Sequence, residues 1–197
     1  MIFDYPVQRS ERRHGPSGYV SYESYRPWLR DEFDFRCVYC LKREVWGQVT
    51  GEFELDHFEP QSANPHLQLD YFNLVYACRR CNSVKSSQVV DDPFHLLCSE
   101  NIETLRDGSL LTDDIGVMRL IRQLDLNSPR MKSWRILWMR IVELTAEYDE
   151  FTYTQLVSVS AEFPDLSQLR TPSNSRIQGI EESWFARQRR GESLQMR

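Results

Sequence analysis

The sequence predicts an α+β protein with a zinc-stabilised module in its first half and a mostly helical C-terminal extension. Four cysteines form two pairs of identical spacing: Cys37, Cys40, Cys78 and Cys81. Between the pairs, residues 49–58 alternate apolar and acidic side chains, which is typical of a half-exposed strand. Beyond residue 93 there is one more cysteine, Cys98, and apolar residues recur at helical spacing.

Length and composition limit the class of protein. The chain has 197 residues, 41% of them hydrophobic and 27% charged, which is enough for a sizeable packed core. We find no apolar run near the roughly 18 residues of a membrane span and no signal-peptide core, so we expect a cytoplasmic protein that does not associate with membranes. The 24 Lys and Arg against 29 Asp and Glu give a net charge of −5, which by itself argues against a nucleic-acid partner.

We expect three segments along the chain. Residues 1–22 are polar and rich in Arg and Ser, which predicts a loosely held N-terminal arm. Residues 23–92 form the cysteine-bearing module, and residues 93–197 the helical extension. The module's expected elements are, in order, a short helix carrying Tyr25, Trp28, Leu29 and Phe33, strands over 49–58 and 74–77, and a helix over 79–87.

The clearest helix of the extension begins after Ser128, a good N-cap residue, with Pro129 at the first helical position. Apolar residues then fall at helical spacing: Met131, Trp134, Leu137, Trp138, Ile141, Leu144 and Tyr148. We expect this face to pack against the rest of the protein. Residues 177–190 predict a last helix with a basic end.

The cysteine pairs predict a structural zinc site. Two residues between paired cysteines let both thiolates face one point, and two such turns supply the four sulfurs of a tetrahedral site. Because 37 residues separate Cys40 from Cys78, we expect a folded insert between the two zinc knuckles. A redox motif of the thioredoxin type needs only one pair in a βαβ setting, and disulfides suit an oxidising compartment, so zinc is the better interpretation. We interpret Cys98 as a buried small apolar residue.

Four short motifs occupy this module: CVYC at 37–40, LDHFEP at 55–60, FNL at 72–74 and CRRCNSVK at 78–85. In residue type, order and spacing they resemble the HNH endonuclease family, in its cysteine-bearing branch. The resemblance covers residues 37–87. It implies a ββα core that grips a metal, with zinc knuckles buttressing it, and the hydrolysis of phosphodiester bonds.

The resemblance also implies roles for individual residues. Asp56 and Asn82 would hold a catalytic Mg²⁺ or Mn²⁺, because carboxylate and amide oxygens suit hard cations. Many members of the family have His where this chain has Asn82, and a His would favour softer metals. His57 would be the general base that takes a proton from the attacking water, and Asn73 would orient His57 or its loop.

Three cations near the second cysteine pair would meet nucleic-acid phosphates: Arg79, Arg80 and Lys85. Surface arginines are otherwise simply solvated, which is the structural alternative for Arg79 and Arg80. In the same way, His57 taken alone could be an ordinary interfacial histidine and Asn73 a turn residue.

We therefore expect a metal-dependent endonuclease acting on DNA, with RNA left open. Residues 124–135, LDLNSPRMKSWR, are similar to the helix that follows the nuclease core in small bacterial HNH proteins associated with phage defence, which implies a defence role. Two alternatives stay open: a zinc-supported nucleic-acid-binding module without catalysis, and a nuclease subunit that works with an ATPase partner. The net acidity favours a partner, because an isolated nuclease usually carries its own positive field.

Overall fold

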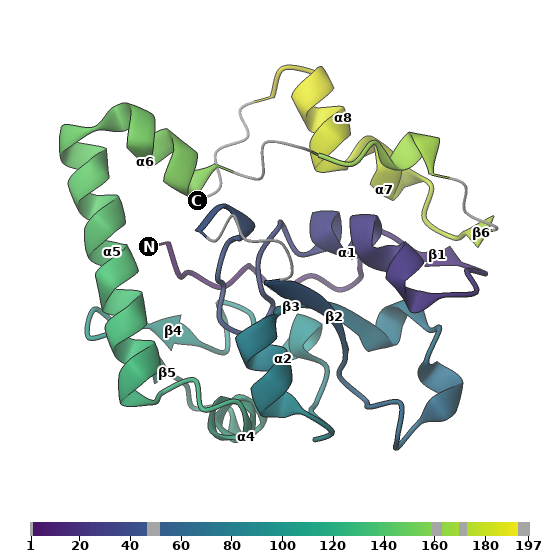
Figure 1. Ribbon diagram of the computed structural model, residues 1–197, viewed down its shortest axis with the longest axis horizontal. Coiled ribbons are helices and arrows are strands. Elements are labelled where there is room, and N and C mark those ends of the chain that lie inside the picture. The colour runs from purple at the N-terminus through teal and green to yellow at the C-terminus, as the bar shows by residue number, and fades with distance from the viewer. Residues whose placement is uncertain (1, 47–51, 159–162, 170–172, 193–197) are drawn as a thin grey trace.

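The computed structural model describes residues 2–46, 52–158, 163–169 and 173–192. Within these ranges three small antiparallel sheets form, β2 with β3, β1 with β6 and β4 with β5, and helices make up most of the second half (Figure 1). The predicted α+β class is therefore confirmed. No helix of the described ranges is both long and apolar enough to cross a membrane.

The centre of the molecule is a ββα unit. Strand β2 (Phe53–His57) pairs antiparallel with β3 (Leu74–Cys78), with His57 opposite Leu74, and helix α2 (Arg79–Lys85) follows directly. All five residues of β3 are buried, as their apolar run LVYAC favours. The predicted strand over 49–58 is confirmed for residues 53–57; residues 49–51 lie outside the described ranges.

Strand β2 is less exposed than its alternating pattern predicts. Asp56, placed on the polar side of the pattern, is only 4% exposed. A charged side chain tolerates burial when it finds partners, and Asp56 finds them in Tyr39 and Lys85. Alternation reveals strand periodicity but does not reveal such partners.

The short helix before the first cysteine pair is confirmed as α1 (Arg26–Glu32), preceded by a 3-10 turn over Tyr22–Tyr25. Trp28 and Leu29 on α1 are fully buried. The helix gives way to two residues in the left-handed region, Asp34 and Phe35, with φ of 54° and 55°. These two residues turn the chain toward the first zinc knuckle.

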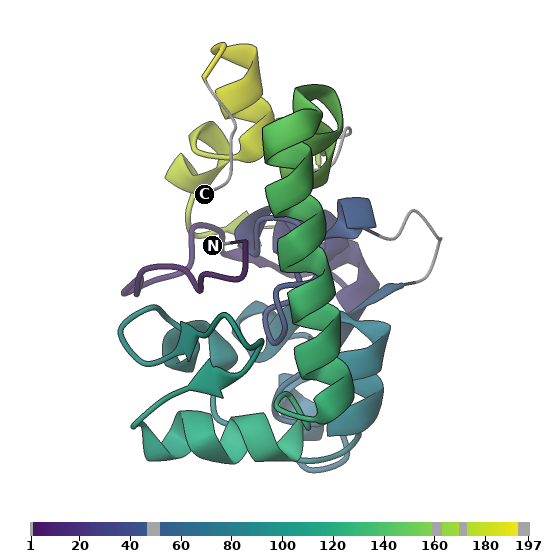
Figure 2. The ribbon, with the colours of Figure 1, turned by 90° about the vertical axis from the view of Figure 1, so that its left-hand side faces the viewer.

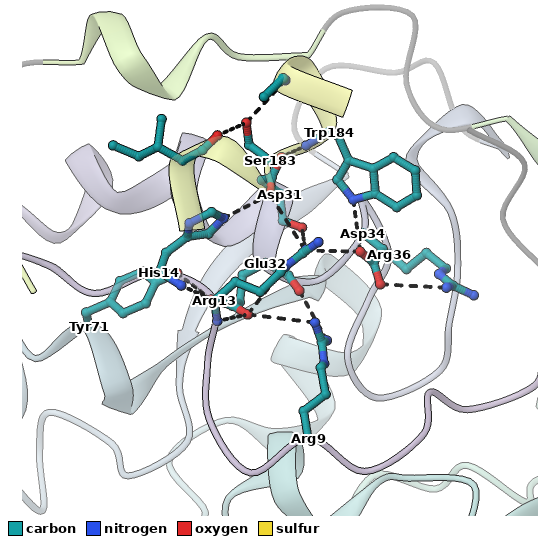
Figure 3. Close-up of polar contacts among 12 residues, drawn as sticks. Arg9, Arg13, His14, Asp31, Glu32, Asp34, Arg36, Tyr71, Ser183 and Trp184 are labelled. Atoms are coloured by element: carbon teal, nitrogen blue, oxygen red, sulfur yellow. Dashed lines mark hydrogen bonds and ion pairs between the residues drawn. The ribbon is translucent and has the colours of Figure 1, made fainter. Parts of the chain in front are cut away.

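The N-terminal segment is not a loosely held arm, so that prediction is wrong. Phe3 is 1% exposed and His14 is fully buried. His14 Nε2 lies 2.8 Å from Asp31 Oδ1, and the His14 backbone N–H donates to Glu32 Oε2 at 3.0 Å (Figure 3). The polar composition of this segment suggested that its side chains are solvated, but they pair with buried carboxylates instead. The segment continues into β1 (Pro16–Ser17).

The same cluster of charged residues also binds the segment that begins at Trp184. The Trp184 backbone N–H donates to Asp31 Oδ2 at 2.8 Å, and its indole N–H donates to Asp34 Oδ1 at 2.9 Å (Figure 3). Helix α8 (Trp184–Arg189) starts here, and α7 (Gln178–Glu181) precedes it. The single helix predicted over 177–190 is therefore broken, because Ser183 leaves the helix to cap α8.

The remaining elements of the described ranges connect these parts. They are the helices α3 (Pro93–Leu96), α4 (Ile115–Gln123), α5 (Pro129–Tyr148) and α6 (Glu150–Val157); the strands β4 (Glu103–Thr104), β5 (Leu110–Leu111) and β6 (Ser173–Asn174); and 3-10 turns over Glu44–Trp46, Pro65–Leu67, Tyr71–Asn73 and Leu166–Gln168.

Helix α5 begins at Pro129, as predicted, but its predicted packing face is partly wrong. Leu137, Leu144 and Tyr148 are 56%, 57% and 76% exposed. The side that faces the protein instead carries Arg135, 1% exposed, whose guanidinium donates to the carbonyls of Gly108 and Leu126. The helix is apolar on two sides, and periodicity alone does not reveal which of them meets the core.

Candidate zinc centre and active site

The four paired cysteines converge on one buried point. The sulfur atoms of Cys37, Cys40, Cys78 and Cys81 all lie within 4.8 Å of one another. The Sγ atoms of Cys40 and Cys78 are 3.7 Å apart. Zinc–sulfur bonds of about 2.3 Å in a tetrahedron require sulfurs about 3.8 Å apart, so this arrangement fits zinc.

Local structure places each sulfur. Leu41, with φ of 60°, closes the first knuckle by donating its backbone N–H to the Cys37 carbonyl at 2.9 Å. Cys78 ends β3, and Cys81 lies in the first turn of α2. Burial raises the pKa of Cys37, whereas hydrogen bonds from neighbouring thiols lower the pKa of Cys78. Four buried sulfurs cannot all ionise without a cation among them, which is the charge that zinc supplies. Cys98 is 1% exposed and lies outside this cluster.

A second site lies at the end of β2. A pocket of about 270 Å³ is lined there by Asp56, His57 and Asn82, with residues of the loops that follow β2 and α2. Asp56 and His57 are neighbours in a strand, yet both line the pocket. The structure thus brings together the three residues that the sequence predicted as catalytic-metal ligands or general base, whereas Asn73, predicted to orient His57 or its loop, does not line the pocket.

Asp56 is held from two sides. Its Oδ1 accepts a hydrogen bond from Lys85 Nζ at 2.9 Å, and its Oδ2 accepts one from the Tyr39 hydroxyl at 2.7 Å. Lys85 Nζ also donates to the backbone carbonyl of His57 at 2.7 Å. A carboxylate oxygen has two lone pairs, so each oxygen of Asp56 keeps one for a further ligand.

The ring of His57 is fixed by its neighbours. Its Nε2 lies 3.0 Å from the backbone carbonyl oxygen of Gln68, and the ring of Tyr22 meets it edge-on at 5.0 Å between centroids. A carbonyl only accepts, so this contact is a hydrogen bond when Nε2 carries the proton. In that tautomer Nδ1 holds a lone pair that can accept a proton; the Gln61 amide nitrogen lies 3.3 Å from it.

The two asparagines have different partners. Asn73 is 2% exposed, and it accepts from the backbone N–H of Glu59 and donates to the Glu59 carbonyl, both at 3.0 Å. It therefore holds the loop that follows His57 in place, through hydrogen bonds to backbone atoms of Glu59 and Leu67. Asn82 donates its amide N–H to Glu54 Oε2 at 2.6 Å, so its carbonyl oxygen points away from this carboxylate.

The three residues predicted to contact phosphates differ in exposure and in partners. Lys85 is fully buried, and its ammonium group pairs with the Asp56 carboxylate inside the protein. The prediction that Lys85 contacts a phosphate is therefore wrong. Arg80 donates to the carbonyl oxygens of Leu124 and Asp125 and thereby ties α2 to the extension. Arg79 has a side chain that is 71% exposed and pairs with Glu54 at 3.2 Å.

Sequence reasoning missed Tyr39 and Gln68. Tyr39 lies between the cysteines of the first knuckle and joins the zinc centre to Asp56. No spacing rule marks it, because any residue fits that position of the motif. Gln68 acts through its backbone carbonyl, which carries no sequence signal at all.

A buried four-sulfur cluster that fits zinc lies beside a ββα unit, and one pocket of that unit is lined by a histidine and two oxygen-bearing side chains. Residues 37–88 match the family model of the HNH endonucleases. The match covers 52 of the 197 residues, so this part of the chain is similar to an HNH domain, a class of nuclease domain. The search of curated proteins found no match.

Proposed function

We propose that this protein is a metal-dependent endonuclease that hydrolyses phosphodiester bonds in DNA. The observation that carries the proposal is the convergence of Asp56, His57 and Asn82 on one open pocket. A carboxylate, an amide and an imidazole in one pocket supply both oxygen ligands and a base. The alternative of a binding module without catalysis gives no reason for this convergence.

The donor atoms fit a hard divalent cation. Asp56 offers an oxygen with a spare lone pair, and Asn82 offers its amide carbonyl oxygen. Oxygen ligands of this kind suit Mg²⁺ or Mn²⁺. When bound, such a cation stabilises negative charge on the phosphate during hydrolysis. The sulfurs of the first site suit zinc, so the two sites take different metals.

The chain's own residues then supply the proton transfer. His57 accepts the proton of the attacking water at Nδ1, while the Gln68 carbonyl holds the Nε2 proton and stabilises the ring once it is charged. Asn73 fixes the loop that follows His57. Lys85 holds Asp56 in place through the 2.9 Å contact between Nζ and Oδ1, and is a positioning residue in this scheme.

The test is cleavage of supercoiled plasmid DNA in Mg²⁺ or Mn²⁺ by the wild type and His57→Ala. We expect His57→Ala to lose at least about 100-fold in rate, the lower end for removal of a general base. His66→Ala is the matched control, because His66 is exposed in the loop after His57 and does not line the pocket. Equal cutting by all three proteins, or none by the wild type, would contradict the assignment.

The working context is also a proposal. With Lys85 buried and Arg80 bonded to the extension, Arg79 is the one of the three predicted phosphate contacts whose side chain is mostly exposed. This favours a nuclease whose partner, such as an ATPase subunit, supplies more of the DNA contact. The phage-defence role rests on the similarity of residues 124–135. If Arg79 alone contacts phosphate when the chain binds DNA without a partner, we expect the logarithm of the affinity to fall with log salt at a slope of only about −1.

A further inference from the structure

A row of apolar side chains on α5 faces away from the protein. Leu137, Leu144 and Tyr148 are more than half exposed, and Ile141 lies between them, partly exposed. At about 100° per residue the row lies on the opposite side of the helix from the buried Met139. Figure 2 shows α5 along the outer side of the molecule with no other labelled element of Figure 1 passing in front of it. Exposed apolar rows of this kind mark interaction surfaces.

The spacing of the row is the same in both directions. The steps from Leu137 to Ile141, to Leu144 and to Tyr148 are four, three and four residues. Two copies of α5, antiparallel and related by a two-fold axis between residues 142 and 143, would place Leu137 against Tyr148 and Ile141 against Leu144. Every apolar residue of the row then meets an apolar residue of the other copy, as a self-complementary two-fold interface requires.

The charges beside the row match the same arrangement. Arg140 and Glu147 are both exposed and flank the row on one side of the helix. About the same axis, Arg140 of one copy falls within about two residues, or about 3 Å along the helix, of Glu147 of the other. A parallel pair in register would instead place each charge beside its own kind. No ion pair of the described ranges involves Arg140 or Glu147, and the neighbour that Glu147 contacts is the Tyr148 hydroxyl, so neither charge is neutralised by an opposite one.

We propose that a second copy of this chain covers this face, so that two molecules pair through an antiparallel contact between their α5 helices. The row spans about 17 Å of helix. A single helix face of this length buries less surface than the roughly 800 Å² per partner of a standard protein–protein interface. The dimer is therefore weak, with a dissociation constant of about 1–100 µM.

The first experiment is sedimentation equilibrium of the zinc-loaded chain over about 1–200 µM. The wild type reaches dimer mass as concentration rises, and Leu144→Glu raises the dissociation constant at least about tenfold. Ile115→Glu is the matched control, because Ile115 is 72% exposed on α4, outside the row, and its loss leaves the dimer intact. Circular dichroism and zinc content are expected to match the wild type in each variant, since both positions are exposed.

The second experiment tests the antiparallel arrangement. Arg140→Glu alone and Glu147→Arg alone each place like charges together and weaken the dimer, whereas the double variant restores the opposite-charge contact and recovers it. A chain that stays monomeric at about 200 µM, a dimer untouched by Leu144→Glu, or a double variant no better than the single ones would overturn the proposal. If the chain stays monomeric, the apolar row would instead be the binding surface for a different protein. The readout is mass, so the result is independent of nuclease activity.

Discussion

Replacing Lys85 with Met removes the buried positive charge that faces the candidate metal-binding carboxylate. The Lys85 ammonium is fully buried and lies 2.9 Å from Asp56 Oδ1 and 2.7 Å from the His57 carbonyl oxygen. Met has a similar length and keeps the apolar contacts of the side chain. The variant therefore leaves Asp56 as a buried carboxylate whose remaining partner in the described structure is the Tyr39 hydroxyl.

Removing one member of a buried ion pair costs about 3–5 kcal/mol, because the other charge is left without compensation. The bond from Tyr39 remains, so we expect a loss at the lower end, about 3 kcal/mol in the free energy of unfolding. For a chain of this length each kcal/mol lowers the melting temperature by about 2–4 °C. Thermal unfolding of zinc-saturated protein should therefore show a fall of about 6–12 °C for Lys85→Met.

A second variant separates lost charge compensation from a general packing defect. Adding Asp56→Asn to Lys85→Met removes the stranded charge and keeps an oxygen that accepts from Tyr39, so the double variant should regain at least half of the lost stability. Arg119→Met is the control, because the ion pair of Arg119 with Asp91 is more than half exposed and should contribute less than about 1 kcal/mol. Lys85→Met melting within about 2 °C of the wild type, or a double variant no more stable than the single one, would refute the reasoning.

Three further outcomes are expected. Purified protein should carry about one zinc ion per chain by elemental analysis, and Cys78→Ser should lower both zinc content and melting temperature, because the site loses one of its four sulfurs. Tyr39→Phe should keep its zinc but need more Mg²⁺ for half-maximal cleavage, since the hydroxyl no longer orients the pocket carboxylate. Asp31→Ala should speed amide hydrogen exchange around His14 and Trp184, since Asp31 bonds to both; unchanged exchange there would contradict that coupling.

The parts of the fold that sequence reasoning predicted are those set by local spacing. Two cysteine pairs determine where four sulfurs meet, and alternation together with an apolar run predicts β2 and β3. Pro129 after Ser128 marks the start of α5 for a local reason as well: a proline at the first helical position forfeits no hydrogen bond. None of these predictions requires knowledge of distant contacts.

The parts that failed depend on contacts between segments far apart in the chain. Polar residues at the N-terminus looked solvated, but His14 meets Asp31 in the core. Lys85 looked like a surface cation because nothing local shows that Asp56, 29 residues earlier, faces it. A lysine near a nuclease motif has two plausible partners, a phosphate outside or a carboxylate inside, and only the pairing of the elements decides between them.

Tyr39 connects the candidate zinc site to the candidate catalytic pocket within one small domain. Tyr39 stands between Cys37 and Cys40, so the zinc knuckle fixes its backbone, and its hydroxyl fixes Asp56 at 2.7 Å. Asn82 follows Cys81 directly, so the second knuckle fixes the other oxygen ligand of the pocket. Both candidate ligands of the catalytic metal are thus positioned by residues of the cysteine motifs. Loss of zinc should therefore disturb the pocket directly, because the positions of both candidate ligands depend on the turns that the four sulfurs hold.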